Sequence, residues 1–174
     1  MGRLGRLILT TASLAAMALP CAAQTALETA VKATYLYKFA PFVTWPQTRD
    51  GPFHICVVGD DPFGAALDQA VANQSYGTRP IQVVRLRAVA PDSPCDVAYI
   101  GGSASQDITA ALKAVQGAPV LTVTDADQPE GIVQFAEDGG RVRFVIDQDQ
   151  ATANGLTISS KMLSLALTVK GARR

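Results

Sequence analysis

The sequence predicts a single three-layer α/β/α domain with a mainly parallel sheet and an antiparallel hairpin near the C-terminus, at one sheet edge. Short apolar runs alternate with helical segments in the order β, α, β, β, α, β, which is typical of a parallel sheet covered on both faces. Two later strand-like runs flank Glu137–Gly140, whose Asp-Gly step is a strong hairpin signal. The 174 residues suffice for one such domain.

The first 23 residues have the pattern of a cleaved secretory signal peptide. Two arginines precede an uncharged, largely apolar run from Leu7 to Leu19, and small residues at Cys21 and Ala23 fit a cut after Ala23. The apolar run is shorter than the roughly 20 residues that a membrane span needs. An uncleaved anchor and a lipidated Cys21 are the alternatives, although the proline before Cys21 fits a lipoprotein site poorly. We therefore expect residues 24–174 to form the mature domain.

The mature chain is expected to begin with a helix over Ala26–Ala40. Thr25 is a possible N-cap, and Glu28 three residues later completes a capping box. Pro41 then ends or kinks the helix. Helical spacing places the following side chains on one apolar stripe: Val31, Tyr35, Leu36, Phe39 and Ala40.

Four strands and two helices are expected next. Glycines stop the apolar, β-rich runs, and Asp60-Asp61-Pro62 supplies an N-cap and a first-turn proline for the first of the two helices. The expected strands are Phe53–Val58, Ile81–Leu86, Asp96–Ile100 and Val120–Thr124, the expected helices are Pro62–Ala72 and Ser105–Val115, and a turn is expected at Ser75–Pro80.

The C-terminal part is expected to contain the hairpin and a last helix. Ile132–Phe135 and Arg141–Ile146 are the hairpin strands. Ile158–Val169 reads as an amphipathic helix that Ser159 and Ser160 cap and start. Its predicted buried stripe is Ile158, Met162, Leu165 and Val169.

Charge and cysteines restrict the possible functions. Without residues 1–23 the chain keeps 13 basic and 15 acidic residues, a net charge of −2 with both signs interspersed. This excludes the basic field that nucleic-acid binding requires. Cys56 and Cys95 are the two cysteines of the mature chain, and an even number in an oxidising compartment predicts a disulfide. Two separate buried thiols are the alternative.

No residue set indicates catalysis, a metal site or a bound cofactor. Gly59–Gly64 has the glycine spacing of a P-loop, but Ala65 and Ala66 stand where lysine and serine or threonine are required. His54 is the only histidine, so a tetrahedral zinc site is not expected, and a hydrolase built on His54 would lack a G-x-S-x-G serine. A weak calcium site or a solvated loop remain open for three acidic residues, Asp125, Asp127 and Glu130.

The segment Tyr35–Pro46 (YLYKFAPFVTWP) holds five of the eleven aromatic residues. A membrane anchor is not expected, because Lys38 and two prolines interrupt the segment. Tyr37, Phe42 and Trp45 fall outside the helical stripe. They are candidates for binding an aromatic or nucleotide-like ligand or a partner, and the alternative is that they cover the sheet edge.

Several blocks of the mature chain, taken in order, resemble the YfiR-like family of periplasmic proteins, named for a repressor of an inner-membrane diguanylate cyclase. The blocks are VKATYLYKFAPFVTWP (Val31–Pro46), FHICVVGDDPFG (Phe53–Gly64), CDVAYIG (Cys95–Gly101), VLTVTD (Val120–Asp125), RVRFVID (Arg141–Asp147) and GLTISSKMLSLA (Gly155–Ala166).

The resemblance implies a secreted, periplasmic regulator that is not an enzyme. Such a protein forms a homodimer and binds the periplasmic domain of a membrane-anchored diguanylate cyclase, which lowers cyclic di-GMP and biofilm formation. Sequestration by an outer-membrane lipoprotein, or redox damage to the folding of the repressor, is implied as the release step. Cys56 and Cys95 match the family's structural disulfide, whereas the second bridge of some relatives is missing here.

Two further expectations concern partners and contacts. The alternative function is a small-ligand sensor that acts on another signalling partner, such as a histidine kinase. Exposed residues of the first helix, the hairpin and the last helix are candidate partner contacts, and those singled out are Arg141, Arg143 and Lys161.

Overall fold

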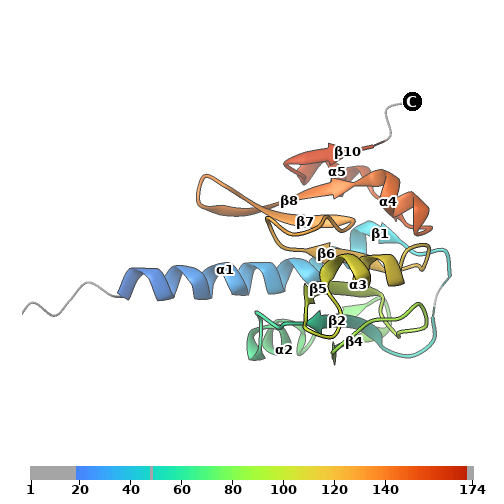
Figure 1. The fold of residues 1–174 in the computed structure, drawn as a ribbon, viewed down its shortest axis with the longest axis horizontal. Helices are drawn as coiled ribbons and strands as arrows, with labels where there is room; N and C mark the ends of the chain where they lie inside the picture. Colours follow the sequence, from blue (N-terminus) through green and yellow to red (C-terminus); the bar gives the residue numbers. More distant parts are fainter. Residues whose placement is uncertain (1–18, 48, 172–174) are drawn as a thin grey trace, which may run out of the picture.

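The computed structural model describes residues 19–47 and 49–171, and its largest feature is an eight-stranded sheet (Figure 1). Across the sheet the strands are β10 (Thr168–Lys170), β8 (Arg141–Asp147), β7 (Val133–Asp138), β6 (Leu121–Thr124), β5 (Val97–Gly102), β2 (Phe53–Gly59), β4 (Arg79–Leu86) and β3 (Ser75–Tyr76). The helices are α1 (Leu19–Lys38), η1 (Ala40–Phe42), α2 (Ala65–Val71), α3 (Ile108–Ala114), α4 (Gln148–Ala153) and α5 (Ser160–Leu165). A separate antiparallel pair joins β1 (Val43–Thr44) and β9 (Thr157–Ile158).

Most neighbouring strands of the sheet are parallel. β2 pairs in parallel with β4 and β5, and β6 and β7 continue in the same direction. β7 and β8 form the antiparallel hairpin that the Asp-Gly turn predicts, with Asp138 opposite Arg141. The predicted α/β fold class with a mainly parallel sheet is therefore confirmed.

Side chains of the central strands alternate between two cores. In β2, Ile55 and Val57 belong to the core under α1 and α2, whereas Cys56 and Val58 belong to the core under α3. Helices thus cover both faces, in the predicted three layers. The helix residues that complete these cores are Ala33, Leu36, Leu67 and Val71 on the first face and Ala111 on the second.

α1 begins earlier than the sequence pattern predicts. Thr25 lies inside the helix, so the predicted N-cap and capping box are wrong. Alanine and glutamine precede Thr25, and these good helix formers give the helix no reason to stop there. Most of the predicted signal peptide falls on residues 1–18, outside the described residues, so its cleavage stays a prediction. No helix of the described segments is long and apolar enough to cross a bilayer.

The first α-helix after β2 begins later than predicted. α2 starts at Ala65, after Gly64, and no side chain caps it. The Asp61 carboxylate instead accepts hydrogen bonds from the backbone N–H groups of Phe63 (2.7 Å) and Gly64 (3.0 Å), one turn before the helix. The predicted turn after α2 is the tight hairpin between β3 and β4.

The predicted helix over Ile158–Val169 is wrong. The segment divides into β9, the short helix α5 and β10. Ser159 caps α5 as predicted, since its hydroxyl accepts a hydrogen bond from the Met162 N–H at 3.3 Å. Beyond α5 the chain becomes extended because the Leu167 N–H donates to the carbonyl of Phe144 at 2.8 Å. β10 therefore lies outside β8, and the hairpin is not at the sheet edge.

Candidate functional site

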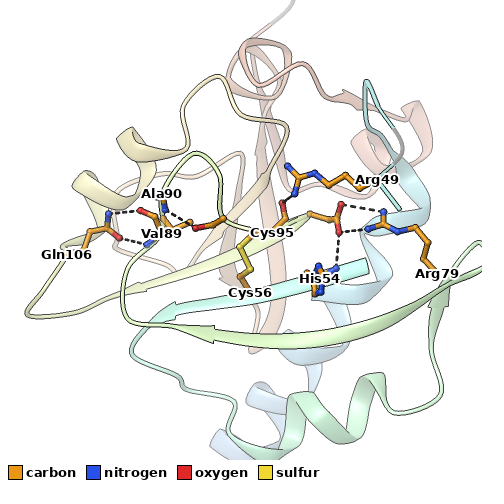
Figure 2. Close-up of a disulfide and its surroundings, with 10 residues drawn as sticks. Arg49, His54, Cys56, Arg79, Val89, Ala90, Cys95 and Gln106 are labelled. Atoms are coloured by element: carbon orange, nitrogen blue, oxygen red, sulfur yellow. Dashed lines mark hydrogen bonds and ion pairs between the residues drawn. A yellow bond between two sulfur atoms is a disulfide. The ribbon is translucent and has the colours of Figure 1, made fainter. Parts of the chain in front are cut away.

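A disulfide joins β2 to the segment just before β5 (Figure 2). Cys56 in β2 and Cys95 just before β5 have Cα atoms 5.6 Å apart, and both residues are fully buried. This is the pair that the even cysteine count predicts. The loop before Cys95 is fixed from its other side by Gln106, whose side-chain amide exchanges two hydrogen bonds with the backbone of Val89. The bridge is therefore part of a rigid corner.

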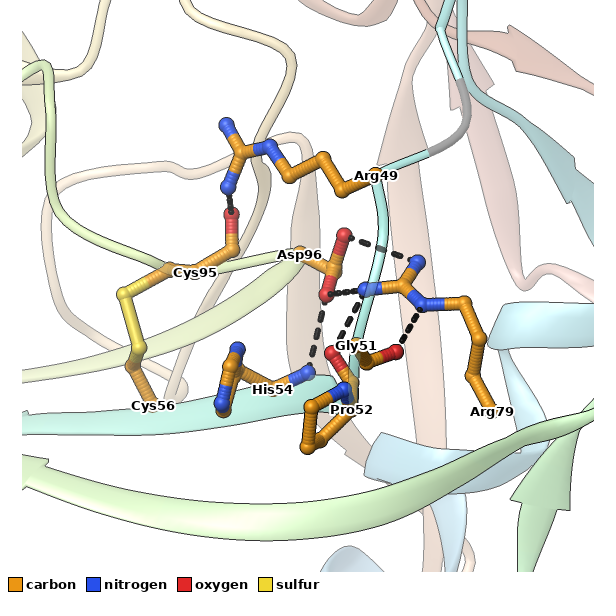
Figure 3. A network of polar contacts seen from close by, with 8 residues as sticks. All are labelled: Arg49, Gly51, Pro52, His54, Cys56, Arg79, Cys95 and Asp96. Carbon is orange, nitrogen blue, oxygen red and sulfur yellow. Dashed lines mark hydrogen bonds and ion pairs between the residues drawn. A yellow bond between two sulfur atoms is a disulfide. The ribbon is translucent and has the colours of Figure 1, made fainter.

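A buried ion pair adjoins this disulfide (Figure 3). The guanidinium of Arg79 in β4 lies 3.0 Å from the carboxylate of Asp96, and the backbone N–H of His54 donates to the same carboxylate oxygen at 2.8 Å. Arg79 also donates to the carbonyls of Gly51 (2.9 Å) and Pro52 (2.6 Å). The network fastens β4, the loop before β2 and the start of β5, so its role is structural.

At the carboxyl ends of β2 and β5, where ligands bind in many open α/β sheets, two backbone segments approach each other closely. Gly59 has φ +82°, and a Cβ atom on it would collide with the carbonyl of Gly102. The N–H of Asp60 donates to that same carbonyl at 2.7 Å. The glycine at position 59 is thus explained by the close approach of two backbones, which favours a structural turn over a phosphate-binding loop for Gly59–Gly64.

The three aromatic candidates are partly buried against the core of the first face. Trp45 contacts Phe53 and Tyr76 with ring centroids 5.4 and 5.6 Å away, both edge-on. Tyr37 and Phe42 pack on the same core. Pairing of β1 with β9 holds their segment in place. This packing favours the interpretation that they cover the sheet, and a ligand-binding role for them stays a prediction.

A groove of about 330 Å³ lies between α1 and the hairpin. Leu27 and Val31 of α1 form one wall with Val142 of β8, and Glu137 and Arg141 contribute opposite charges at the hairpin. In Figure 1 the N-terminal half of α1 and the β7–β8 hairpin extend from the body on the same side. The groove therefore combines apolar walls with charge, as binding sites for small molecules commonly do.

Ion pairs form the polar side of this groove. Lys32 lies 2.7 Å from Asp125, just after β6, and 2.7 Å from Glu28 one turn earlier in α1. Burial alone would lower the pKa of Lys32, but the hydrogen bonds to Asp125 and Glu28 outweigh it and raise that pKa. The Tyr99 hydroxyl lies 3.5 Å from Asp125, and burial followed by the Asp125 charge raises its pKa well above the usual range. Lys32 therefore stays protonated and Tyr99 neutral.

The three basic candidates lie in different places. Arg141 lines the groove, whereas Arg143 donates a long hydrogen bond (3.5 Å) to the Leu165 carbonyl, at the end of α5. The amino group of Lys161 lies 5.6 Å from the ring centre of Phe42. Lys161 and Phe42 are thus the predicted site residues that the structure brings together, and Arg141 is separate from them.

The acidic residues after β6 do not gather into a calcium site. Asp125 pairs with Lys32, and Glu130 pairs with Lys170 of β10. Within residues 19–47 and 49–171, no group of three or more potential metal ligands is found. These carboxylates instead connect α1 and β10 to the loop that precedes β7.

Sequence reasoning missed the groove because its walls are far apart in the chain. Lys32 and Asp125 are separated by 93 positions. One local signal was present, since Glu28 and Lys32 have the i, i+4 spacing of a helical ion pair. That spacing marks a helix face but gives no indication of the loop that covers it.

Comparison with known proteins identifies the relationship at the level of a family. The model of the YfiR/HmsC-like family matches residues 29–167, from α1 to just before β10. No curated protein matches the chain. The matched range contains the disulfide, the buried ion pair and the sheet up to β8. The chain therefore belongs to the YfiR/HmsC-like family.

Proposed function

We propose that this protein is a periplasmic regulator that binds the periplasmic domain of a membrane-anchored diguanylate cyclase and holds the cyclase inactive. The family match over residues 29–167 carries the proposal. The buried Cys56–Cys95 disulfide supports an oxidising compartment, as does the predicted signal peptide. The protein acts by binding, with no chemical step of its own, and lowers cyclic di-GMP and biofilm formation.

Deleting the gene is expected to raise cellular cyclic di-GMP several-fold, because the cyclase loses its inhibitor. Quantification of the nucleotide by mass spectrometry measures the effect. Complementation with the full chain restores the low level, whereas a chain that lacks residues 1–23 stays in the cytoplasm and restores nothing. An unchanged level in a deletion strain with an intact cyclase contradicts the proposal.

Release of the cyclase completes this proposed function. We propose that an outer-membrane lipoprotein sequesters the regulator and that the regulator acts as a homodimer. Size-exclusion chromatography with light scattering on the mature chain tests the dimer. Co-purification of the regulator with the outer-membrane fraction, and its loss when the lipoprotein is removed, tests sequestration.

The groove favours a second candidate function, a small-ligand sensor that acts on a partner such as a histidine kinase. Its 330 Å³ volume falls within the range of small-molecule sites, and it combines apolar walls with the partly buried ion pair of Lys32 and Asp125. The position differs from the aromatic segment that the sequence suggested. A ligand there would contact α1 and the hairpin together and could alter their relative position.

A sensor is expected to gain thermal stability from its ligand. At a ligand concentration 100 times Kd, the gain is about 2.7 kcal/mol, which thermal melting across a panel of amino acids and nucleotides detects. Leu27→Arg, at a position 66% exposed in the groove, should abolish the gain. Leu165→Arg is the matched control, since Leu165 is 54% exposed and is not a groove residue. If no compound of the panel raises the melting temperature, the result contradicts the sensor function.

A further inference from the structure

β10 is the outermost strand of the sheet beyond the hairpin (Figure 1, red). It pairs in parallel with β8, with Thr168 opposite Val145 and Lys170 opposite Asp147. All three of its residues are exposed. Among the described residues, no strand pairs with its other side.

The backbone of β10 presents unpaired hydrogen-bonding groups outward. The N–H of Leu167 donates to the carbonyl of Phe144, so Leu167 faces β8 through its backbone. Backbone groups of successive strand residues point to opposite sides, so Val169 also faces β8. The N–H and C=O groups of Thr168 and Lys170 therefore point away from the sheet, in position to pair with another strand.

Exposed apolar side chains concentrate at the same edge. Leu165, Leu167 and Val169 are 54%, 43% and 37% exposed, and they make up three of the four large exposed hydrophobic residues in the described segments. In-register residues project from the same face, so Val169 lies beside the buried Ile146. The patch thus extends the core of the α1 face to the rim of the sheet, as interaction surfaces commonly do.

The opposite edge of the sheet ends in β3, whose two residues pair with the start of β4. Just beyond this pairing, the N–H of Ile81 in β4 donates to the carbonyl of Gln74. The Arg85 side chain is fixed by Asp61 and Asp68, both at 2.7 Å. A charged side chain held at an edge is a common protection against added strands. β10 also carries a charged residue held by an ion pair, Lys170 with Glu130, so the two edges differ in the exposed apolar patch beside β10 and not in edge charge.

Two cations without a described ion partner lie near this open edge. Arg143 on β8, and Lys161 one helical turn before Leu165 on α5, form no ion pair with any described residue. Arg143 contacts the carbonyl of Leu165, so its charge lies beside the apolar patch. A second copy docked edge to edge would bring these cations toward their own counterparts. An acidic partner would neutralise them instead.

We propose that the outer edge of β10 is the docking site for an extended, acidic and apolar segment of a partner protein, which adds as a further strand to the sheet. The backbone groups of Thr168 and Lys170 bind its main chain. Leu165, Leu167 and Val169 contact its apolar side chains. The assignment of this segment to the periplasmic domain of the cyclase rests on the proposed function.

A blocked synthetic peptide in which valine and glutamate alternate tests the edge without any natural partner. Hydrogen exchange at the Thr168 and Lys170 amides, followed by NMR, should slow at least about tenfold in saturating peptide. A valine–lysine peptide should bind at least about tenfold more weakly. Unchanged exchange at both amides, or equal binding of the two peptides, overturns the proposal.

Thr168→Pro removes one outward N–H, and Thr168→Ala is the matched control that keeps it. The proline variant should bind the acidic peptide at least about tenfold more weakly than the alanine variant. Should the proline variant melt early, Leu167→Glu takes its place, since it puts a like charge in the apolar patch of an intact backbone. Equal binding by the proline and alanine variants overturns the proposal.

Binding measurements with the purified periplasmic domain of the cyclase then test whether the docking segment belongs to that domain. Binding to the wild-type chain that Thr168→Pro weakens, and Thr168→Ala does not, supports the assignment. If both variants bind the domain as tightly as the wild-type chain does, the cyclase does not dock on the β10 edge, and the proposed function is unaffected. A domain that binds no form of the chain contradicts the proposed function, while the peptide result still decides whether the edge accepts a strand.

Discussion

Arg79→Met is expected to lower the free energy of unfolding by about 3–5 kcal/mol, which is the usual cost of removing one partner of a buried ion pair. Asp96 is buried, and the methionine variant leaves its carboxylate with only the N–H of His54, 2.8 Å away. The carbonyls of Gly51 and Pro52 lose donors in the same step. Urea denaturation followed by circular dichroism measures the loss.

The double variant Arg79→Met/Asp96→Asn separates the ion pair from the packing of its side chains. Asparagine keeps an acceptor for the His54 N–H and carries no charge, so the double variant should be more stable than Arg79→Met alone. Asp96→Asn alone should cost less than Arg79→Met, since Arg79 keeps both carbonyls. A loss below about 1 kcal/mol for Arg79→Met would mean that the pair is effectively solvated.

The sheet was largely predictable because its central strands are buried on both faces. Such strands read as continuous apolar runs, and β2 ends within one residue of the predicted Phe53–Val58. The C-terminal segment was not predictable in the same way. Leu165 and Val169 have helical spacing, but pairing of Leu167 with Phe144 makes the chain extended, and a contact between residues so far apart leaves no local signal. α4 was missed because Ala151 is its one buried residue.

In the candidate site, too, the features that depend on local sequence were predictable, and those that depend on long-range contacts were not. The disulfide was predictable from cysteine count and compartment alone. The Arg79–Asp96 pair required the register of β2 with β4 and β5, which no local pattern specifies. Arg141 and Lys161 were chosen as charged surface residues, and the sequence could not show that one lines a groove while the other lies over Phe42. The open edge of β10 was hidden by the helix predicted in its place.

Loss of the Cys56–Cys95 disulfide is expected to destabilise the protein by about 4 kcal/mol, because the bridge closes a loop with a sequence separation of 39. For a chain of this size the melting temperature should fall by about 8–16 °C. The comparison is between oxidised protein and protein refolded with reductant, since the two thiols preserve the volume of the core. Calorimetry of both forms measures the difference.

Cys56→Ala/Cys95→Ala should melt below even the reduced wild type, because both sulfur atoms are fully buried and their removal leaves a cavity. Cys95 directly precedes Asp96, so the disulfide and the ion pair restrain the same corner. Arg79→Met should therefore cost less in the reduced protein than in the oxidised one. Strictly additive losses would show that the two act independently, and a reduced form that melts within about 2 °C of the oxidised form would contradict the stabilising role of the bridge.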